Sequence, residues 1–277
     1  MRGIILAGGT GSRLFPLTKV VSKQLLPIYD KPLIYYPLST LMLANIREIL
    51  IICTPRDISA FIDLFGDGKQ LGIDIKYETQ EKPNGIADAF TIGENFIGDE
   101  NVALILGDNL FHGQGLGQQL SRYKYVSGAQ IFAHKVADPN NYGVVEFDNK
   151  GNILSIEEKP HHPKSFFAIP GLYFYDNTIV NKAKSVLPSA RGEKEISAIN
   201  LMYLQEGNLK VEILERGTVW MDTGNIENLL AASHFVQTLE QRQGLKISCI
   251  EEVAWRNRWI SGDQMLQLIE GYGATSY

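Results

Sequence analysis

A glycine-rich loop follows directly on the first apolar run of the chain. Residues 3–7, GIILA, lead into residues 8–13, GGTGSR. Glycine permits positive φ and lets backbone N–H groups close on phosphate oxygens. The loop lacks the Gly-Lys-Ser/Thr ending of a Walker A motif, and Leu14 replaces the last glycine of a dinucleotide fingerprint, which argues against an NAD-dependent oxidoreductase. By itself the loop is compatible with a phosphate site or with an ordinary strand–turn junction.

Cationic side chains lie in this loop and after it. Arg13 belongs to the loop, and Lys19 and Lys23 follow in the segment PLTKVVSKQLLP. A guanidinium or ammonium group can offset the charge of a transferring phosphoryl group and of the pyrophosphate that leaves. For Lys19 a solvated surface lysine is the better interpretation. Arg13 and Lys23 are therefore the candidate cations of a phosphate site.

Two aspartates each follow a short apolar run. Asp108 comes after residues 102–106, VALIL, and Asp222 lies in the segment WMDTG. A carboxylate at the end of a strand can hold a hard cation through oxygen and leave the other positions to water and phosphate. The distance between the two in sequence decides nothing, and Asp222 before TGN is also compatible with a helix cap.

Polar groups suited to a base and to a sugar occur in two further segments. Gln80 offers an amide donor and acceptor that match O4 and N3–H of thymine or uracil, although a single glutamine is more often a surface residue. Gly85 is expected to open a helix where backbone can approach a base. Strand alternation directs the neighbours Glu158 and Lys159 to opposite faces, so both point inward only if the chain bends, and Pro160 can supply that bend.

The apolar runs predict the elements that position these residues. Strands are expected at residues 3–7, 49–53, 73–78 and 102–106, with crossover helices at 33–44, 58–65 and 86–96. Near-continuous apolar strands separated by helices predict a parallel sheet covered on both faces. Because ligands bind beyond the carboxyl ends of such strands, we expect the chemistry just after Leu6, Thr79 and Leu106.

The second half of the chain has a different pattern. Short strands are expected at residues 129–135, 143–147, 153–157, 171–175, 211–214 and 218–221, and helices at 195–206 and 225–243. The predicted fold is an α/β, Rossmann-like three-layer mixed sheet, mostly parallel, with an antiparallel extension and a small C-terminal helical cap. We expect a main domain of residues 1–243 and a helical appendage of the same unit, residues 244–277.

Composition narrows the class of protein. A chain of 277 residues, 44% hydrophobic and 21% charged, can bury the core of a large α/β domain. With a net charge of −5, no global positive field would attract nucleic acid or an anionic membrane. The opening MRGIILAGG is too short an apolar run for a signal sequence or a membrane span. Cys53 and Cys249 are isolated, which fits buried thiols in a reducing cytoplasm.

Taken in order, the motifs resemble those of the sugar nucleotidyltransferases over nearly the whole chain. They are GGTGSRLFPLT, SKQLLPIYDKPLIYYPLSTLM, ETQEKPNGIADAF, ILGDNLFHG, DPNNYGVVEF, EEKP, PGLYFYD and WMDTG. Within the family they are most similar to the enzymes that join dTTP to glucose 1-phosphate at the entrance to dTDP-sugar synthesis, including that of dTDP-rhamnose. One departure is Asp88, where the resemblance leads us to expect a neutral glutamine.

The resemblance implies a role for each candidate residue. It assigns one Mg²⁺ to Asp108 and Asp222, and catalysis to Arg13, Lys23 and Lys159. It implies nucleotide binding by Gly8, Gly9, Thr10, Gly11, Arg13, Gln24, Gln80 and Gly85. It implies sugar-phosphate binding by Asn109, Gly143, Glu158, Lys159, Ile169 and Arg191, with Ile169 acting through its backbone. For Arg191 a solvated loop arginine is an equally good interpretation.

The reaction that this resemblance implies is a direct displacement. The sugar phosphate attacks the α-phosphorus of dTTP in line and pyrophosphate leaves, so that positioning and charge neutralisation supply most of the catalysis. We expect a soluble cytoplasmic homo-oligomer, a tetramer or a dimer, that binds neither nucleic acid nor membrane. The alternatives are a UTP-using uridylyltransferase and a nucleotide-sensing subunit without turnover. The joint presence of the charged candidates favours an enzyme.

Overall fold

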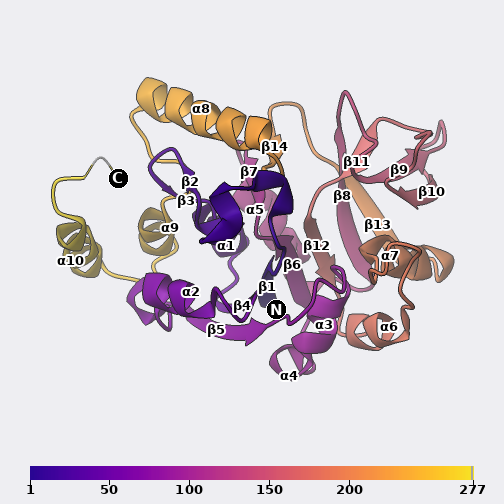
Figure 1. Cartoon of the computed structure of the whole chain (residues 1–277), viewed down its shortest axis with the longest axis horizontal. Coiled ribbons are helices and arrows are strands. Elements are labelled where there is room, and N and C mark those ends of the chain that lie inside the picture. Colours follow the sequence, from indigo (N-terminus) through magenta and orange to yellow (C-terminus); the bar gives the residue numbers. More distant parts are fainter. Residues whose placement is uncertain (276) are drawn as a thin grey trace.

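The computed structural model of the protein describes residues 1–275 and 277, and a ten-stranded sheet runs through it (Figure 1). One half of the sheet is parallel. Its strands, in spatial order, are β5 (Asp74–Thr79), β4 (Glu48–Cys53), β1 (Arg2–Ala7) and β6 (Val102–Leu106). These are the four strands that the first half of the sequence predicts, each within one residue of the expected bounds.

Antiparallel strands extend the sheet beyond β6. In spatial order they are β12 (Leu172–Tyr175), β8 (Ala129–Lys135), β11 (Phe167–Ile169), β9 (Gly143–Phe147) and β10 (Ile153–Glu158). A tenth strand, β13 (Leu209–Ile213), pairs with β8 in the parallel direction. The predicted combination of a parallel core with an antiparallel extension is therefore confirmed.

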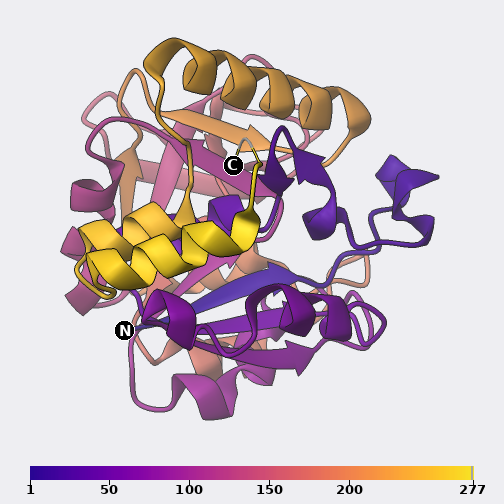
Figure 2. The same ribbon diagram turned by 90° about the vertical axis from the view of Figure 1, so that its left-hand side faces the viewer.

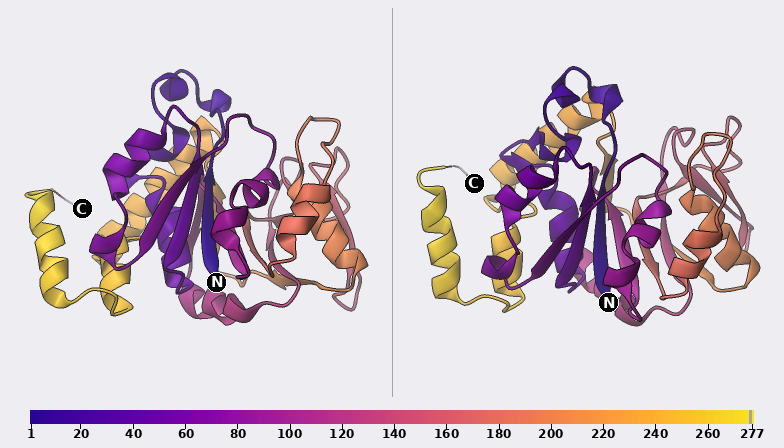
Figure 3. Two further views of the ribbon diagram at one scale, coloured as in Figure 1. Left: turned by 90° about the horizontal axis from the view of Figure 1, so that it is seen from below. Right: turned by 60° about the horizontal axis from the view of Figure 1, so that its bottom comes forward.

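Helices cover both faces of the parallel strands, so that successive strand residues are buried in opposite directions. Ile5, Ile51 and Ile105 pack on one face with α1 (Tyr35–Leu43) and α2 (Ile58–Phe65). Ile4 and Leu50 pack on the other face with α3 (Asp88–Ile92), α6 (Ile179–Ser185) and α7 (Ile196–Gln205). Figure 3 shows these two helical layers on either side of the strands. The three-layer arrangement explains why β1, β4 and β6 are nearly continuous apolar runs, whereas the edge strand β5 alternates apolar with polar residues.

A small two-stranded ladder lies beside the main sheet. β7 (Asn109–His112) pairs with β14 (Val219–Asp222), so that Asp222 lies opposite Asn109. The long helix α8 (Ile226–Gln243) follows β14, and Asn225 caps it by accepting a 2.8 Å hydrogen bond from the backbone nitrogen of Asn228. Val236 of α8 packs on a short hairpin of β2 (Pro27–Ile28) and β3 (Lys31–Pro32). The ladder and its helix bring residue 222 back to the end of β6.

Two helices close the described chain. α9 (Ile250–Arg256) packs Ile250 and Ala254 into the cluster that holds α1, and α10 (Gly262–Tyr272) lies alongside α9 (Figure 2). Cys53 is buried and Cys249 is half-buried, and both are free thiols. None of the helices in residues 1–275 is long and apolar enough to cross a membrane.

The structure differs from the sequence prediction at several helices. The helix expected over residues 86–96 is two short helices, α3 and α4 (Glu94–Ile97), because Gly93 ends the first and begins the second. The helix α5 (Leu116–Ser121) and the strand β7 were not predicted. Short 3₁₀ turns also lack a periodic signal; they are Ser12–Leu14, Leu17–Lys19, Lys23–Leu25, Lys69–Leu71 and Arg122–Tyr125.

Candidate active site

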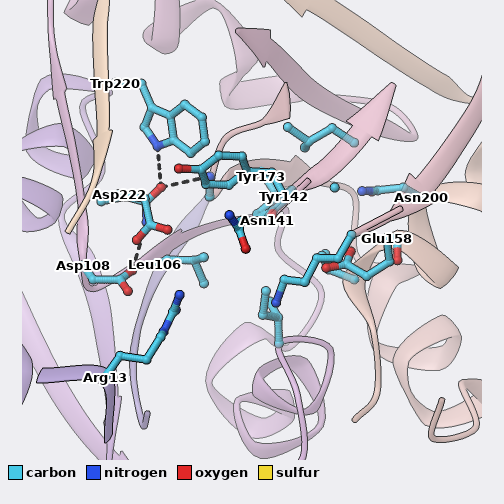
Figure 4. Close-up of a pocket in the computed structure, with 18 residues that line it drawn as sticks. Arg13, Leu106, Asp108, Asn141, Tyr142, Glu158, Tyr173, Asn200, Trp220 and Asp222 are labelled. Carbon is cyan, nitrogen blue, oxygen red and sulfur yellow. Dashed lines mark hydrogen bonds between the residues drawn. The ribbon is translucent and has the colours of Figure 1, made fainter. Parts of the chain in front are cut away.

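A pocket opens at the carboxyl ends of the parallel strands, where the sequence places the chemistry (Figure 4). Among its lining residues are the predicted site residues Arg13, Asp108, Asn109, Gly143, Glu158, Lys159, Ile169 and Asp222. The loops after β1 and β6 supply Arg13 and Asp108, whereas β9, β10 and β11 supply Gly143, Glu158 and Ile169. The parallel core and the antiparallel extension therefore each form one side of the same pocket.

Asp108 and Asp222 are held at one end of this pocket by main-chain contacts. Asp222 is the last residue of β14 and lies opposite Asn109. The next residue, Thr223, donates from its backbone nitrogen over 3.0 Å and from Oγ1 over 2.9 Å to the carbonyl oxygen of Asp108. The helix cap considered for Asp222 is supplied by Asn225 instead. The strand pairing and the two hydrogen bonds from Thr223 thus fix the two aspartates near each other.

The environment gives these two carboxylates different pKa values. The Lys23 ammonium forms an ion pair with Oδ2 of Asp108, and both side chains are largely buried. Burial raises the pKa of Asp108, but the charge and the hydrogen bond of Lys23 outweigh it and hold that pKa below its ordinary value. For Asp222, burial and then the negative charge of Asp108 raise the pKa to about 6. This end of the pocket therefore favours an additional positive charge.

The side-chain amide of Asn109 connects three elements around these acids. Its Nδ2 donates to Oδ1 of Asp108 over 2.9 Å. Its Oδ1 accepts from Trp220 Nε1 over 2.6 Å and from the backbone nitrogen of Gly171 over 3.1 Å (Figure 4). These bonds fix which end of the amide faces which neighbour. The sugar contact predicted for Asn109 stays a prediction, in which the second N–H of Nδ2 would be the donor.

Glu158 and Lys159 both line the pocket because the chain bends at Lys159 itself. Lys159 has φ 44°, in the left-handed region, where a residue with a side chain costs about 1–2 kcal/mol. Its backbone nitrogen donates to the carbonyl oxygen of Tyr142 over 3.0 Å, which holds the bend. The bend expected at Pro160 therefore occurs one residue earlier.

Glu158 lies at the other end of the pocket from the two aspartates (Figure 4). Burial and then the negative charge of Glu195 raise its pKa, although the charges of Lys159 and Arg191 act in the opposite direction. Arg191 is outside the set of lining residues: it pairs with Glu193 at 3.1 Å and with Glu195 at 3.3 Å, and it lies 3.9 Å from Glu158. Its predicted contact with the sugar phosphate stays a prediction, for which its guanidinium would have to leave these carboxylates.

The glycines of the loop after β1 meet different requirements. Gly11 adopts a left-handed conformation with φ 62°, which a side chain would disfavour. At Gly8 the requirement is space, because a Cβ there would lie 2.6 Å from Oε1 of Gln80. Gly9 and Thr10 between them are exposed. The tip of the loop is thus exposed to solvent, and the absence of a side chain at Gly8 leaves room for the side chain of Gln80.

Gln24 lies behind this loop as a buried residue. Its Oε1 accepts a 2.7 Å hydrogen bond from Ser22 Oγ. A Cβ at Gly107 would lie 3.0 Å from Gln24 Cγ, so Gln24 supports the turn that leads from β6 to Asp108. The nucleotide contact predicted for Gln24 stays a prediction.

The side-chain amide of Gln80 is oriented by Asp88. Its Nε2 donates to Oδ2 of Asp88 over 3.2 Å and to the carbonyl oxygen of Gly85 over 3.4 Å. Asn84 also donates to Oδ2 of Asp88, over 3.3 Å. Because an ionised carboxylate can only accept, the nitrogen of Gln80 must face Asp88 and its Oε1 faces Gly8. Both groups of the Gln80 amide were predicted to face a base. Only Oε1 remains available for one, because Nε2 is hydrogen-bonded within the protein.

Gly85 joins the loop after Gln80 to the segment before α7. It has φ 104°, and a Cβ there would lie 2.4 Å from the carbonyl oxygen of Lys194. The backbone nitrogen of Lys194 donates to Asn84 over 2.6 Å, and that of Ala87 donates to Lys194 over 3.2 Å. Glycine is required here by this contact, and the helix that Gly85 was expected to open begins only at Asp88.

Several lining residues were not predicted. They are Ile86, Leu106, Asn141, Tyr142, Gly171, Tyr173, Ile196, Ser197, Asn200 and Trp220. Tyr142 and Trp220 lie next to predicted residues within the quoted motifs, so the motifs contain a signal for them. Tyr173 also lies within a quoted motif, PGLYFYD, but Asn200 belongs to a helix where no local pattern distinguishes a pocket residue from a core residue.

A Rossmann-like sheet that gathers two aspartates, a loop arginine and a Glu–Lys pair in one pocket is the arrangement of a nucleotidyltransferase. Residues 2–238 match the nucleotidyl transferase family, and the chain belongs to this family. It is 57% identical to the glucose-1-phosphate thymidylyltransferase of Mycobacterium tuberculosis over 278 aligned residues, which cover 99% of this chain and 96% of that relative. The resemblance inferred from the motifs is confirmed.

Solved structures support the same assignment. A Bacillus anthracis protein crystallised with a sucrose superposes with a TM-score of 0.78 at 38% identity, over 85% of this chain and 94% of that one. A UDP-glucose pyrophosphorylase complexed with UDP-glucose superposes with a TM-score of 0.74 at 26% identity, over 86% of this chain and 98% of that one. The fold is thus shared with one protein crystallised with a sucrose and with another complexed with UDP-glucose.

We expect Gly85→Ala to impair nucleotide use far more than Gly192→Ala does. Both glycines have positive φ, at 104° and 77°, so both substitutions meet backbone strain, but only the Cβ at 85 would collide with backbone. Gly85→Ala should raise the KM for the nucleoside triphosphate and lower the melting temperature by several degrees more than the control, since overpacking costs about 1–3 kcal/mol. Equal effects in steady-state kinetics and thermal melting would show that the contact with Lys194 is unimportant.

Proposed function

We propose that the protein condenses dTTP with glucose 1-phosphate to form dTDP-glucose and pyrophosphate, the entry to dTDP-sugar synthesis, including that of dTDP-rhamnose. The observation that carries the proposal is the distribution of charge in the pocket. Two aspartates and Arg13 lie at one end, and Glu158 and Lys159 lie at the other. A nucleotide phosphate and a sugar phosphate can meet between these groups, in a chain whose family transfers nucleotidyl groups.

In this proposal an oxygen of the sugar phosphate attacks the α-phosphorus of dTTP in line. The new O–P bond forms as the bond to the β-phosphate oxygen breaks, and pyrophosphate leaves with the electron pair. The attacking oxygen is already an anion at neutral pH, so no general base and no covalent intermediate are needed. Because both substrates are anions, catalysis consists mainly of positioning and charge neutralisation.

The charged residues divide this work between the two substrates. Arg13, on the loop after β1, offsets charge on the pyrophosphate, and Lys159 holds the sugar phosphate. Lys23 keeps Asp108 ionised and lies close enough to the acids to interact with the triphosphate. Glu158 accepts hydrogen bonds from sugar hydroxyls. The neighbouring backbone of Gly143 and Ile169, which are paired across β9 and β11, supports the same sugar.

A divalent cation fits the acid cluster by its chemistry, and nucleotidyltransferases generally use one. Asp108 and Asp222 provide oxygen ligands, and the raised pKa of Asp222 reflects a need for positive charge. Within the described residues no group of three or more His, Cys, Asp or Glu could hold a metal, so water and phosphate would complete the shell, as Mg²⁺ prefers. We propose Mg²⁺, which when bound would offset charge on the α-phosphate.

The base is recognised through the acceptor that Gln80 leaves available. Oε1 can accept from N3–H of thymine or uracil, whereas N3 of cytosine is itself an acceptor. A site built around one polar group rejects a base that leaves that group unpaired by large factors, but it does not distinguish thymine from uracil, which differ by a methyl group. The second candidate function is therefore the same reaction with UTP, which the likeness to a UDP-glucose pyrophosphorylase favours.

Three further expectations complete the proposal. The chain acts as a homo-oligomer, a tetramer or a dimer, which light scattering coupled to gel filtration would measure. It acts in the cytoplasm, without nucleic-acid or membrane partners. Residues 1–243 form the nucleotidyltransferase domain, and residues 244–277, which include α9 and α10, form an appendage of the same unit.

We expect Asp108→Asn and Asp222→Asn each to abolish turnover that depends on a divalent cation. Losing one carboxylate removes several kcal/mol of charge stabilisation, on the order of a 10³-fold loss in kcat. Pyrophosphate release and binding of Mn²⁺ in the presence of dTTP, followed by electron paramagnetic resonance, should both fall. Asp63→Asn, at an exposed position of α2, is the matched control. Full turnover of either folded variant in excess chelator would refute the metal assignment.

Replacement of Lys159 should affect the sugar phosphate selectively. Hydrogen bonds to charged groups contribute about 1.5–3 kcal/mol, so Lys159→Ala should raise the KM for glucose 1-phosphate roughly 10- to 100-fold with little change in the KM for dTTP. Lys159→Gly loses the same ammonium but relieves the strain at φ 44°, so it should share the kinetic defect and melt at a higher temperature than the alanine variant. Equal losses for both substrates would place Lys159 elsewhere.

The coupling between Gln80 and Asp88 can be tested by exchanging their polarity. In a pyrophosphate-release assay the wild-type protein should prefer dTTP, use UTP less well and use CTP, ATP and GTP poorly. Gln80→Glu places a second carboxylate 3.2 Å or so from Asp88, so kcat/KM for dTTP should fall by about tenfold or more. In the double variant Gln80→Glu/Asp88→Asn, the amide now at position 88 donates to the carboxylate now at position 80. The hydrogen bond is restored in the reverse direction, and activity should largely recover. Asp88→Asn alone still offers an acceptor and is the control.

A double variant that is no better than Gln80→Glu would show that Asp88 does not orient Gln80. A wild-type protein that used CTP or ATP as well as dTTP would remove Gln80 from base recognition and with it the thymidylyl assignment.

A further inference from the structure

One buried amide in the pocket has a donor without a partner. Asn200 lies in α7, is fully buried and lines the pocket from the side of Glu158. Its Oδ1 accepts a 2.5 Å hydrogen bond from the hydroxyl of Tyr175. Its Nδ2 has no hydrogen-bond partner among the described residues. Buried amide donors are almost always paired in folded proteins, so an unpaired one that faces a pocket indicates a missing acceptor.

The orientation of this amide is fixed by Tyr175. The Tyr175 ring is fully buried, stacks on Tyr203 at 5.5 Å and meets Phe90 edge-on at 5.5 Å. Its hydroxyl donates to Oδ1 of Asn200, which places the amide oxygen on the Tyr175 side. The other end of the amide, Nδ2, is the end left without a partner at the pocket.

The surroundings of Nδ2 define the kind of group it would meet. In Figure 4 the nitrogen of Asn200 points into the pocket on the side where Glu158 lies, away from Asp108 and Asp222. Glu158 offers a carboxylate, which accepts, and Asn200 offers an N–H, which donates. A hydroxyl group is the complement of this pair, because its oxygen can accept from Nδ2 while its hydrogen is donated to a carboxylate.

We infer that Asn200 is a sugar-specificity residue whose Nδ2 donates to one hydroxyl of the hexose, and that Tyr175 is the residue that positions it. This inference rests on the proposed function, since it assumes that a hexose phosphate occupies the Glu158 end of the pocket. The contact adds a donor on the side of the pocket where Glu158 supplies an acceptor. Asn200 lies in the first half of α7.

The test compares glucose 1-phosphate with its 2-, 3-, 4- and 6-deoxy analogues, each with dTTP, in the wild-type protein and in Asn200→Ala. The wild-type protein should prefer glucose 1-phosphate over each deoxy analogue that loses a contact. In Asn200→Ala, kcat/KM for glucose 1-phosphate should fall about 3- to 10-fold, the value of a neutral hydrogen bond. The preference over one deoxy analogue should then vanish while the other preferences and the KM for dTTP stay unchanged.

A matched variant separates this role from a structural one. Asn200→Ala leaves the Tyr175 hydroxyl without an acceptor and can lower stability, so Asn200→Ala/Tyr175→Phe, which removes both groups, should regain melting temperature without regaining selectivity. Tyr175→Phe alone keeps the donor but frees its orientation, and should weaken the same preference partially. If selectivity among the deoxy analogues is identical in the wild-type protein and in both folded Asn200 variants, Nδ2 binds only water and the inference is overturned.

Failure of the proposed function would look different. A wild-type protein that does not release pyrophosphate from dTTP and glucose 1-phosphate, whatever the variants do, would overturn the function itself and leave no sugar for Asn200 to read.

Discussion

The structure depends on keeping two buried carboxylates together although they repel each other. Asp108 lies in the turn between β6 and β7 and Asp222 at the end of β14, and neither side chain holds the other in place. The pairing of β7 with β14 and the two hydrogen bonds from Thr223 to the main chain of Asp108 fix their positions. The ladder and these hydrogen bonds therefore oppose the repulsion, while Lys23 and Asn109 engage the carboxylate of Asp108.

The same principle extends along the pocket, where main-chain contacts connect elements with different tasks. Lys194 exchanges backbone hydrogen bonds with residues on both sides of Gly85, so the segment before α7 is tied to the loop that orients Gln80. Asn109 connects Asp108 to Trp220 and to the backbone of Gly171. Side chains of the pocket thus stand on a continuous framework, which suits a reaction that relies on positioning.

The sequence predicts the parallel core well because β1, β4 and β6 are buried on both faces and read as nearly continuous apolar runs. It also places Asp108 correctly, since a polar residue directly after such a run lies at the carboxyl end of a strand. The helix over residues 86–96 is split because Gly93 interrupts a pattern that periodicity treats as unbroken. β7 escapes prediction because its partner, β14, is more than a hundred residues away in sequence.

Orientation is harder to predict than location. Gln80 was identified, but that its amide nitrogen is engaged by Asp88 depends on a loop conformation that residue types do not reveal. Lys159 reaches the pocket through a left-handed bend at its own Cα, where a proline next in sequence was the more obvious cause. Asn200 carries no local signal, and the motif PGLYFYD that contains Tyr175 does not reveal that its hydroxyl bonds to a residue of α7.

The β7–β14 ladder also has a consequence for folding during synthesis on the ribosome. The four parallel strands are complete once residue 106 has been synthesised, and a nascent chain can begin to pack them early. Asp222, by contrast, is the last residue of β14, the final strand of the described residues. For most of translation the growing chain contains Asp108 and its partner Lys23 but not Asp222. The second carboxylate is added only after the strands of the main sheet have been synthesised. The order of synthesis therefore brings the two carboxylates together only after the parallel strands have been made.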